Sequence, residues 1–426
     1  MTTLRLGRRR GTTTRPAAPR RRLSWRLRVA RRLAVVAESA SRVLGAGAGG
    51  VIGGRLILAL APDAARRLAS GRDVLLVSGT NGKTTTASHL VAGLATDRPV
   101  VGNTDGANTP AGLVRALAWG RATAVLETDE GWLPWAVEQT RPVLVVLLNL
   151  SRDQLHRHHE VAALAATWHE ALRTVDHVVA NADDPDVVHP ALAARRQTWV
   201  ALGIRWTEDS TVCPRCGGAC RRTAVEWACH SCGLRRPEPD WWLEGADLVS
   251  ATTRVPLRPA LPGHANLANA AVAVVAAAAM GVPPRRTASA VEQIDAVAGR
   301  YDVVEHAGRQ VRLLLAKNPA SWVEALEMAS TRNVPLVLAF NSDGVDGRDP
   351  SWLYDVPFGA LADRSVVVTG RRSTDLLVRL EMEGLTDVRV AESLTSGLQS
   401  LPPGPVDLVA NYTAFQEARR ELSHGP

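Results

Sequence analysis

The chain has 426 residues, of which 46% are hydrophobic, and its formal net charge at pH 7 is +8. This length is enough for two or three domains with sizeable cores. Residues 1–32 contain twelve arginines and no acidic residue, so the remainder carries 8 − 12 = −4. We therefore expect a disordered, Arg-rich arm over residues 1–32 and a body without the basic surface of a nucleic-acid-binding protein.

The arm is followed by an apolar stretch, residues 33–60, that charged residues and six glycines interrupt. A membrane-spanning helix needs about 20 mostly apolar residues, so we expect none here. No secretory signal follows the arginines, and we expect a cytoplasmic protein. The sequence predicts helices at 32–43 and 62–69, with a glycine-rich turn between them.

A phosphate-binding loop is predicted after the apolar run 74–77. A helical pattern, 84–96, follows it, and between them stands Ser78-Gly79-Thr80-Asn81-Gly82-Lys83-Thr84-Thr85-Thr86. Backbone N–H groups of such a loop bind phosphate oxygens, the lysine reaches the β- and γ-phosphates, and the threonine hydroxyl ligates Mg²⁺. Val77 stands where the longer form of the motif has glycine. We expect this loop to bind ATP.

Continuous apolar runs and helical patterns alternate from residue 73, as in a parallel sheet covered on both faces. The predicted strands are 73–78, 99–102, 121–127, 142–149, 176–180 and 198–202. The predicted helices are 84–96, 109–119, 131–139, 160–173 and 187–196. Ligands of such sheets bind at the carboxyl ends of the strands, where we therefore look for site residues.

Acidic residues follow the strand 121–127 at that edge. Glu127 is the preferred Mg²⁺ ligand and Glu130 the second choice, because Mg²⁺ beside a phosphate loop needs carboxylate oxygens. A solvated acidic loop is the alternative. The histidines at 156, 158 and 159 could bind a metal, but three such residues within four positions are more often exposed to solvent.

Cysteines interrupt the α/β pattern between residues 203 and 241. Four of them form two C-x-x-C turns, Cys213-x₂-Cys216 and Cys229-x₂-Cys232, and Cys220 falls outside this spacing. Four thiolates suit tetrahedral Zn²⁺ and leave no open coordination position, so we predict a structural zinc ribbon. In a cytosolic chain zinc is favoured over disulfides. Zinc ribbons often bind nucleic acid, but an insertion within an α/β domain favours stabilisation or a protein contact.

A long helix rich in Ala and Val is predicted from residue 261 to 279. Asn266 and Asn269 are three residues apart near its start and share one face. There they could hold a base or a ribose, or simply cap the helix.

A second α/β unit is predicted from about residue 303. Its predicted strands are 310–315, 335–340, 365–369, 387–390 and 407–410, and its predicted helices are 319–329, 373–382, 393–399 and 413–422. The polar segment 341–352 contains three aspartates and follows the strand 335–340. We favour a functional site there over a plain turn.

These motifs together resemble the Mur ligase superfamily. They are G-T-N-G-K-T-T-T at 79–86, Glu127 at a strand end, N-L-S-R-D-Q-L at 149–155 and L-P-G-H-A-N-L-A-N-A-A at 261–271. The Cys₄ insertion and D-G-V-D-G-R-D-P-S-W at 343–352 resemble one branch, the MurT-type synthetase subunits of lipid II isoglutaminyl synthase. The resemblance runs from about residue 34 to the C-terminus.

The resemblance implies an α/β fold in two parts. Residues 33–300 are expected to form a Mur-ligase-like central P-loop ATPase domain with a parallel sheet and a zinc ribbon inserted at about 207–240. Residues 301–426 are expected to form a Rossmann-like C-terminal α/β domain of the MurT type.

The resemblance also implies roles for single residues. The loop residues 79–85, including Lys83 and Thr84, serve ATP and Mg²⁺, and Glu127 binds the metal. Further nucleotide contacts are expected from Asn266, Asn269, Arg300 and Lys317. Asp349 matches an aspartate tied to activity near a glutaminase partner, with Asp346 and Asp355 as close alternatives. Asn103 and residues 106–108 resemble the N-x-x-G-A-N loop of this branch.

The implied reaction is an ATP-dependent amidation. ATP phosphorylates the α-carboxylate of D-glutamate in the stem peptide of lipid II, and ammonia displaces phosphate to give D-isoglutamine. We expect a separate glutamine amidotransferase subunit, of the GatD type, to supply ammonia within a heterodimer, because zinc spacing accounts for four of the five cysteines. The expected place of work is the inner face of the membrane.

The chain departs from ordinary Mur ligases at three points. They use a carbamylated lysine in the central domain, and this chain has no lysine between Lys83 and Lys317. Gln154 stands where they have histidine, and residues 156–159 read H-R-H-H where the branch reads D-R-Y-G. About 40 orderable residues precede the loop, which is too few for a UDP-binding domain. We therefore expect a lipid-linked acceptor.

Two alternatives stay open at this point. One is an amino-acid-adding ligase of the Mur or folylpolyglutamate type, against which the missing lysine argues. The other is a zinc-ribbon P-loop ATPase that binds nucleic acid through its Arg-rich arm.

Overall fold

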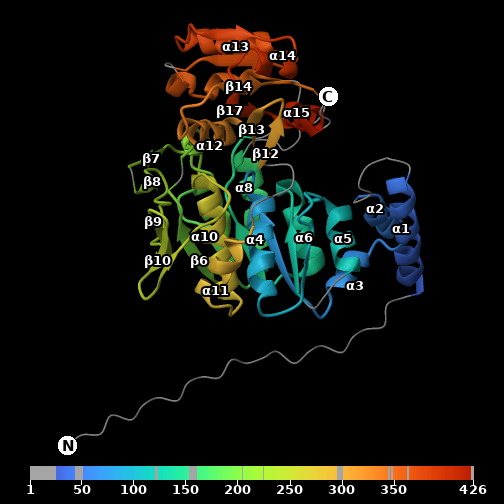
Figure 1. Cartoon of the computed structure of the whole chain (residues 1–426). Coiled ribbons are helices and arrows are strands. Elements are labelled where there is room, and N and C mark those ends of the chain that lie inside the picture. The colour runs from blue at the N-terminus through green and yellow to red at the C-terminus, as the bar shows by residue number, and fades with distance from the viewer. Residues whose placement is uncertain are drawn as a thin grey trace, which may run out of the picture.

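The computed structural model describes most of the chain. The described residues are 25–43, 51–119, 123–152, 161–203, 205–223, 225–294, 301–343, 346, 349–361 and 364–423. They form two α/β units, with the C-terminal unit stacked on one end of the central unit (Figure 1). This architecture confirms the predicted fold class.

The central unit is built on a nine-stranded sheet in the order β11-β10-β9-β6-β5-β4-β1-β3-β2. Six strands were expected and are present: β1 (Asp73–Ser78), β2 (Val100–Gly102), β3 (Thr123–Glu127), β4 (Leu144–Leu147), β5 (Val178–Asn181) and β6 (Gln197–Ala201). Neighbouring strands among these six run parallel. The continuous apolar runs that predicted them are buried on both faces.

Three further strands extend this sheet beyond the ribbon and were not predicted. They are β9 (Trp241–Glu244), β10 (Asp247–Ser250) and β11 (Arg254–Pro256). β9 joins β6 in parallel, and β10 and β11 follow as antiparallel strands. These strands have only three or four residues, and β9 and β10 show no regular alternation of buried and exposed positions, so the sequence does not distinguish them from turns.

Helices cover the central sheet on both faces. On one face lie α4 (Lys83–Ala95), α10 (His264–Ala279) and α11 (Pro284–Val291), which pack on the side of β1 that carries Leu75 and Val77. The other face is covered by α5 (Pro110–Ala118), α6 (Leu133–Thr140), α8 (Val161–Leu172) and α9 (Pro185–Ala191). α11 was not predicted. Four of its eight residues are Arg, Thr or Ser, and Thr287, Ala288 and Val291 are buried.

The N-terminal helices differ from the sequence prediction. Helix α1 (Trp25–Val43) begins seven residues before the expected start at residue 32, so the segment 25–32 is helical and not part of a disordered arm. Helix α2 (Ile52–Leu60) contains two glycines of the expected glycine-rich turn, Gly53 and Gly54, and α3 (Ala64–Ala69) follows it. The other four glycines of that turn lie outside the described residues. Residues 1–24 lie outside the described part of the chain.

Glycines in α2 explain why the prediction failed. A Cβ at Gly54 would lie 1.8 Å from the carbonyl oxygen of Ala111 in α5, and one at Gly53 would lie 2.1 Å from Glu38 Oε1 in α1. These glycines therefore allow α2 to pack closely between two helices. Packing overrides their poor intrinsic helix propensity.

The C-terminal unit contains a six-stranded sheet in the order β12-β13-β17-β14-β15-β16. Its strands are β12 (Tyr301–His306), β13 (Arg309–Leu315), β14 (Leu336–Ala339), β15 (Val366–Thr369), β16 (Val388–Val390) and β17 (Gly404–Ala410). The helices α12 (Pro319–Ser330), α13 (Ser373–Met382), α14 (Leu394–Gln399) and α15 (Tyr412–Ser423) surround it. All were predicted except β12, which pairs antiparallel with β13.

A buried ion pair joins two strands of this sheet. Arg312 in β13 donates to both carboxylate oxygens of Asp407 in β17, at 2.8 and 2.7 Å, and to the carbonyl oxygen of Met328. The Asp407 side chain is fully buried. Bidentate geometry and the additional acceptor compensate the cost of removing both charges from water.

Among the described residues, no helix is long and apolar enough to cross a membrane.

The packing of α2 predicts the effect of a single added methyl group. Gly54→Ala should destabilise the protein by about 1–3 kcal/mol, because the new Cβ meets the backbone of α5 and overpacking costs more than alanine's helix propensity returns. Denaturant unfolding measures this difference. Gly359→Ala is the control, because its Cβ would meet only the end of the Glu383 side chain, at 3.4 Å. Unchanged stability of Gly54→Ala would contradict this packing.

Candidate functional site

The candidate site lies at the carboxyl edge of the central parallel sheet. β1 lies between β4 and β3. The phosphate loop follows β1, Glu127 ends β3, Asn149 follows β4, and Asn181 ends β5. Because parallel strands present their carboxyl ends at one edge, the polar residues that end these strands meet there.

Two glycines with positive φ shape the phosphate loop. Gly79 has a φ of 149° and Gly82 a φ of 84°, backbone angles that residues with a side chain rarely adopt. A Cβ at Gly82 would lie 2.3 Å from Asn269 Oδ1, so only glycine lets the loop approach α10 this closely. Asn149 holds the loop from the other side, because its Oδ1 accepts the Asn81 N–H at 2.9 Å and its Nδ2 donates to the Asn81 carbonyl at 3.1 Å.

Lys83 is buried and paired with Glu130. Its Nζ donates to Glu130 Oε2 at 2.8 Å and to the carbonyl oxygens of Gly79 and Thr80. Burial disfavours the ammonium, but the carboxylates of Glu130, Glu127 and Asp129 outweigh it and raise the pKa of Lys83. For Glu130, burial is likewise outweighed by Lys83 and Lys317, which lower its pKa. Both groups are therefore charged at neutral pH.

Thr84 and Glu127 are adjacent oxygen donors. Thr84 Oγ1 donates to Glu127 Oε2 at 2.8 Å, and both residues are buried. Two neighbouring ligands of an octahedral Mg²⁺ at 2.0–2.1 Å are separated by about 2.9 Å. The two oxygens therefore fit Mg²⁺, and the strand-end carboxylate predicted from the sequence is at the expected place.

Two asparagines of the loop after β2 hold Glu127. Asn103 accepts the Glu127 N–H and donates to the Glu127 carbonyl, both at 2.8 Å. Asn108 Nδ2 donates to Glu127 Oε1 at 3.3 Å, and its carbonyl accepts the Asp129 N–H. The sequence marked this loop only by resemblance, and its contact with Glu127 could not be inferred without the fold.

A pocket opens between the loop and the C-terminal unit. Its cavity has a volume of about 240 Å³ and is lined by Lys83, Thr84, Asn269 and residues of the C-terminal unit that include Lys317 and Ser321. Apolar side chains such as Leu148, Leu202, Val272 and Met328 line the rest. A mostly apolar wall with a few converging polar groups is typical of a small-molecule site.

Contacts between the two units close this pocket. The side-chain amides of Asn81 in the loop and Asn318, which caps α12, pair at 3.3 Å. Glu324 in α12 accepts the N–H of Ala265 at the start of α10, at 3.2 Å. Figure 1 shows α12 facing the end of the central unit that carries this edge of the sheet. The C-terminal unit therefore contributes directly to the wall of the pocket.

The other predicted nucleotide contacts differ in their surroundings. Asn269 accepts the Thr86 hydroxyl at 3.2 Å, whereas Asn266 donates to the Pro262 carbonyl at 2.6 Å. Neither side chain caps α10, whose N-cap residue is Gly263. Both line the pocket, as does Lys317. Arg300 lies outside the described residues, and so do Gln154 and the three histidines of residues 156–159.

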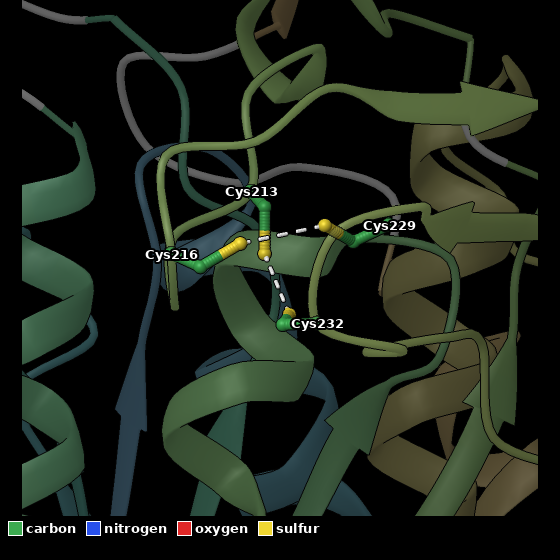
Figure 2. A group of neighbouring side chains, drawn as sticks. All are labelled: Cys213, Cys216, Cys229 and Cys232. Atoms are coloured by element: carbon green, nitrogen blue, oxygen red, sulfur yellow. Dashed lines mark hydrogen bonds between the residues drawn. The ribbon is translucent and has the colours of Figure 1, made fainter.

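The four predicted zinc ligands come together. Figure 2 shows the sulfurs of Cys213, Cys216, Cys229 and Cys232 pointing toward one another from two loops. The four sulfurs lie within 4.8 Å of one another, with Cys213 and Cys232 3.7 Å apart and Cys216 and Cys229 3.5 Å apart. Sulfurs around a tetrahedral Zn²⁺ are about 3.8 Å apart, given a Zn–S distance of ~2.3 Å. The cluster therefore fits zinc.

The ribbon formed by β7 (Cys220–Arg222) and β8 (Trp227–Cys229) packs on the central unit. Trp227 Nε1 donates to the Ala182 carbonyl at 3.0 Å, and Arg222 donates to the Asp183 carbonyl at 3.0 Å. Arg236 pairs with the Asp183 carboxylate at 2.7 Å. Asp183 also accepts the N–H groups of Leu202 and Gly203, two residues of the pocket wall. The ribbon thus supports that wall from outside.

The aspartates of the polar segment after β14 lie apart from the pocket. Asp349 is exposed and accepts the Ser351 N–H at 2.9 Å, which lowers its pKa. Asp346 accepts from Thr413. Asp355 pairs with Arg152 of the central unit at 3.0 Å, and Arg152 also pairs with the buried Asp209.

Comparisons with known proteins match both units. The family model described as "Mur ligase middle domain" matches residues 77–212, and the one described as "MurT ligase C-terminal" matches residues 315–415. The resemblance to the MurT branch of the Mur ligase superfamily, expected from the sequence motifs, is thereby confirmed.

Relatives with assigned names agree with this resemblance. The lipid II isoglutaminyl synthase (glutamine-hydrolyzing) subunit MurT of Streptococcus pneumoniae is 26% identical, over 88% of this chain and 93% of the relative. The subunit of the same name from Staphylococcus aureus strain N315 is 27% identical, over 82% and 86% of the two chains.

Solved structures share the fold. A pseudomurein peptide ligase type C from Methanothermus fervidus superposes on this chain with a TM-score of 0.66 at 18% identity, over 82% of this chain and 78% of the other. MurF from Acinetobacter baumannii gives 0.65 at 18% identity, over 86% and 80%.

The oxygen pair at the sheet edge predicts how magnesium affects nucleotide binding. Thr84→Val keeps the shape of the side chain but removes one Mg²⁺ ligand. The factor by which Mg²⁺ increases the affinity for ATP should therefore be about tenfold smaller in the variant than in the wild type. Titration calorimetry with and without Mg²⁺ measures this. Thr84→Ser retains the oxygen and should behave as the wild type does. A full Mg²⁺ effect in the valine variant would exclude Thr84 as a ligand.

The ribbon geometry predicts the zinc content and its effect on stability. Cys216→Ser should lose the one zinc ion per chain and lower the melting temperature, because the ribbon's contacts with Asp183 and Ala182 depend on its fold. Elemental analysis and thermal unfolding measure both. Cys220→Ser is the matched control and should retain zinc. Loss of zinc in both variants, or in neither, would refute the Cys₄ assignment.

Proposed function

We propose that this chain is the synthetase subunit of a lipid II-amidating enzyme. It would convert the α-carboxylate of D-glutamate in the lipid II stem peptide into the amide of D-isoglutamine, with ATP as the energy source. The observation that carries this proposal is the pocket between the two units, with Lys83 and Thr84 at one wall and Lys317 at the other. Glu127 is hydrogen-bonded to Thr84 behind the first wall. The names of relatives that span nearly the whole chain support the substrate and the reaction.

ATP would lie with its phosphates on the loop 79–85. Lys83 is already charged and buried among carbonyl oxygens, so anionic phosphate oxygens can replace these weaker partners at little cost of reorganisation. Lys317 adds positive charge from the C-terminal unit. Mg²⁺, held by Thr84 and Glu127, would supply further charge neutralisation on the phosphates. Asn269, with Asn266 and Arg300, would complete the nucleotide site.

Chemistry then proceeds in two steps. An oxygen of the substrate α-carboxylate attacks the γ-phosphorus, the bond from that phosphorus to ADP breaks, and an acyl-phosphate forms. The nitrogen of ammonia next attacks the acyl carbon, loses a proton, and expels inorganic phosphate. Contacts such as Asn81–Asn318 keep the C-terminal unit over the pocket, which would protect the acyl-phosphate from water.

Ammonia would come from a separate glutamine amidotransferase subunit, of the GatD type, bound as a heterodimer. Asp349 is the residue that we assign to this partner. Its carboxylate is exposed and charged, and contacts with the backbone N–H and the side chain of Ser351 fix its orientation. The subunit description in the relatives' names supports a partner of this kind.

The experiment incubates the chain with lipid II, ATP and Mg²⁺, and supplies either ammonium or glutamine with the partner subunit. The mass of the product should show OH replaced by NH₂ on the stem peptide, and Lys83→Ala should abolish this change. Asp349→Asn should keep the ammonium-driven reaction and lose most of the glutamine-driven one. ATP hydrolysis without a mass change would contradict the proposed acceptor, and incorporation of an amino acid would favour an amino-acid-adding ligase.

A further inference from the structure

Helix α1 has two apolar faces, and only one of them is used by the fold. The inner face carries Leu27, Ala30 and Ala34, which are fully buried in the core of the central unit. Further along, Glu38 is buried and pairs with Arg115 of α5 at 3.3 Å. This face anchors α1 at the outer edge of the central unit, with α2 and α5 on its inner side (Figure 1).

The outer face of α1 carries a second set of large apolar side chains. Trp25, Val29, Leu33 and Val36 are 65%, 44%, 45% and 66% exposed. Their spacing of four, four and three residues places them on one stripe of the helix. The opposite face of α1 is already packed against the core, so this stripe does not contribute to the core. Exposed apolar stripes of this kind are typical of interaction surfaces.

Arginines border this apolar stripe. Arg26, Arg28 and Arg32 are exposed on the same helix, and the first acidic residue of the chain is Glu38, which is buried. Arg31 lies over the ring of Trp119 at 5.2 Å and helps to fix the helix in place. The outer face therefore combines apolar and positively charged side chains and lacks exposed negative charge.

We propose that the outer face of α1 docks on the surface of a bilayer that contains anionic lipids. The apolar stripe would enter the headgroup region, and the arginines beside it would bind lipid phosphates. Trp25, at the end of the stripe, is of the residue type enriched at this depth. This inference rests on the proposed function in one respect, because a lipid-linked substrate requires the enzyme to work at such a surface.

The charge and the apolar stripe together favour a membrane over a nucleic acid. The basic residues alone could bind either an anionic membrane or a nucleic acid. The exposed Val29, Leu33 and Val36 side chains, however, would contribute no binding free energy on a nucleic acid's phosphate backbone, where they stay in water. Burial of these side chains in a headgroup layer does contribute binding free energy.

Sedimentation of the full chain with lipid vesicles tests the proposal. Vesicles of phosphatidylglycerol and phosphatidylcholine are compared with vesicles of phosphatidylcholine alone, at physiological ionic strength and without substrate. The wild-type chain should bind the anionic vesicles, and Val29→Glu/Val36→Glu should bind them about tenfold more weakly. The matched control is Met382→Glu/Val390→Glu, which adds the same charge at sites 66% and 53% exposed in the C-terminal unit. It should bind as the wild type does.

Three results would overturn the proposal. They are no binding by the wild-type chain, equal binding by the two double variants, and retention of the wild-type chain by duplex DNA without binding to vesicles. Because the assay needs no turnover, its outcome does not depend on the reaction. Amidation of lipid II in detergent micelles by Val29→Glu/Val36→Glu, at the wild-type rate, shows that the variant is folded, and failure of the wild type in that assay would refute the proposed function alone.

Discussion

The site is organised by one buried charge, the ammonium of Lys83. Taking it out of water is expensive, and the cost is compensated by Glu130, by two loop carbonyls and by nearby carboxylates, which together raise its pKa. A buried charge with fixed partners needs no reorganisation when phosphates arrive, and this is the condition for strong electrostatic stabilisation of a transferring phosphoryl group. The surrounding elements serve this arrangement. β1 leads into the phosphate loop, and β3 places Glu127 next to that loop. α10 packs so closely against the loop at Gly82 that no side chain fits there.

The second constraint is that the pocket belongs to two units. Asn81 meets Asn318, and Lys317 contributes positive charge near Glu130 from the opposite wall. A site divided in this way can exclude water only when the units are together, which suits a reaction through an acyl-phosphate. The four-cysteine ribbon lies at the same end and reaches the wall through Asp183, so its role extends from local stability to the shape of the pocket.

Sequence reasoning succeeded where one physical demand dominates. The glycine and lysine pattern predicts the strand, loop and helix around Lys83, and the cysteine spacing predicts the four-sulfur cluster. Continuous apolar runs predict the parallel strands. It failed where packing between segments distant in the sequence determines the local structure or the contacts of a side chain. Gly54 reads as a helix breaker until the contact with α5 is known. The pairing of Lys83 with Glu130 and the clamp of Asn103 on Glu127 join segments that only the folded sheet brings together.

The central claim is that the α-carboxylate of the substrate is activated by phosphorylation in this pocket. Isotope transfer tests it most directly. Lipid II is prepared with ¹⁸O in both oxygens of that carboxylate, the chain is supplied with ATP, Mg²⁺ and ammonium, and the inorganic phosphate is examined by mass spectrometry. The account predicts one ¹⁸O in the phosphate for each amide formed, because the attacking oxygen leaves with the phosphoryl group. Amide formation with unlabelled phosphate would contradict an acyl-phosphate and the role of the site described above.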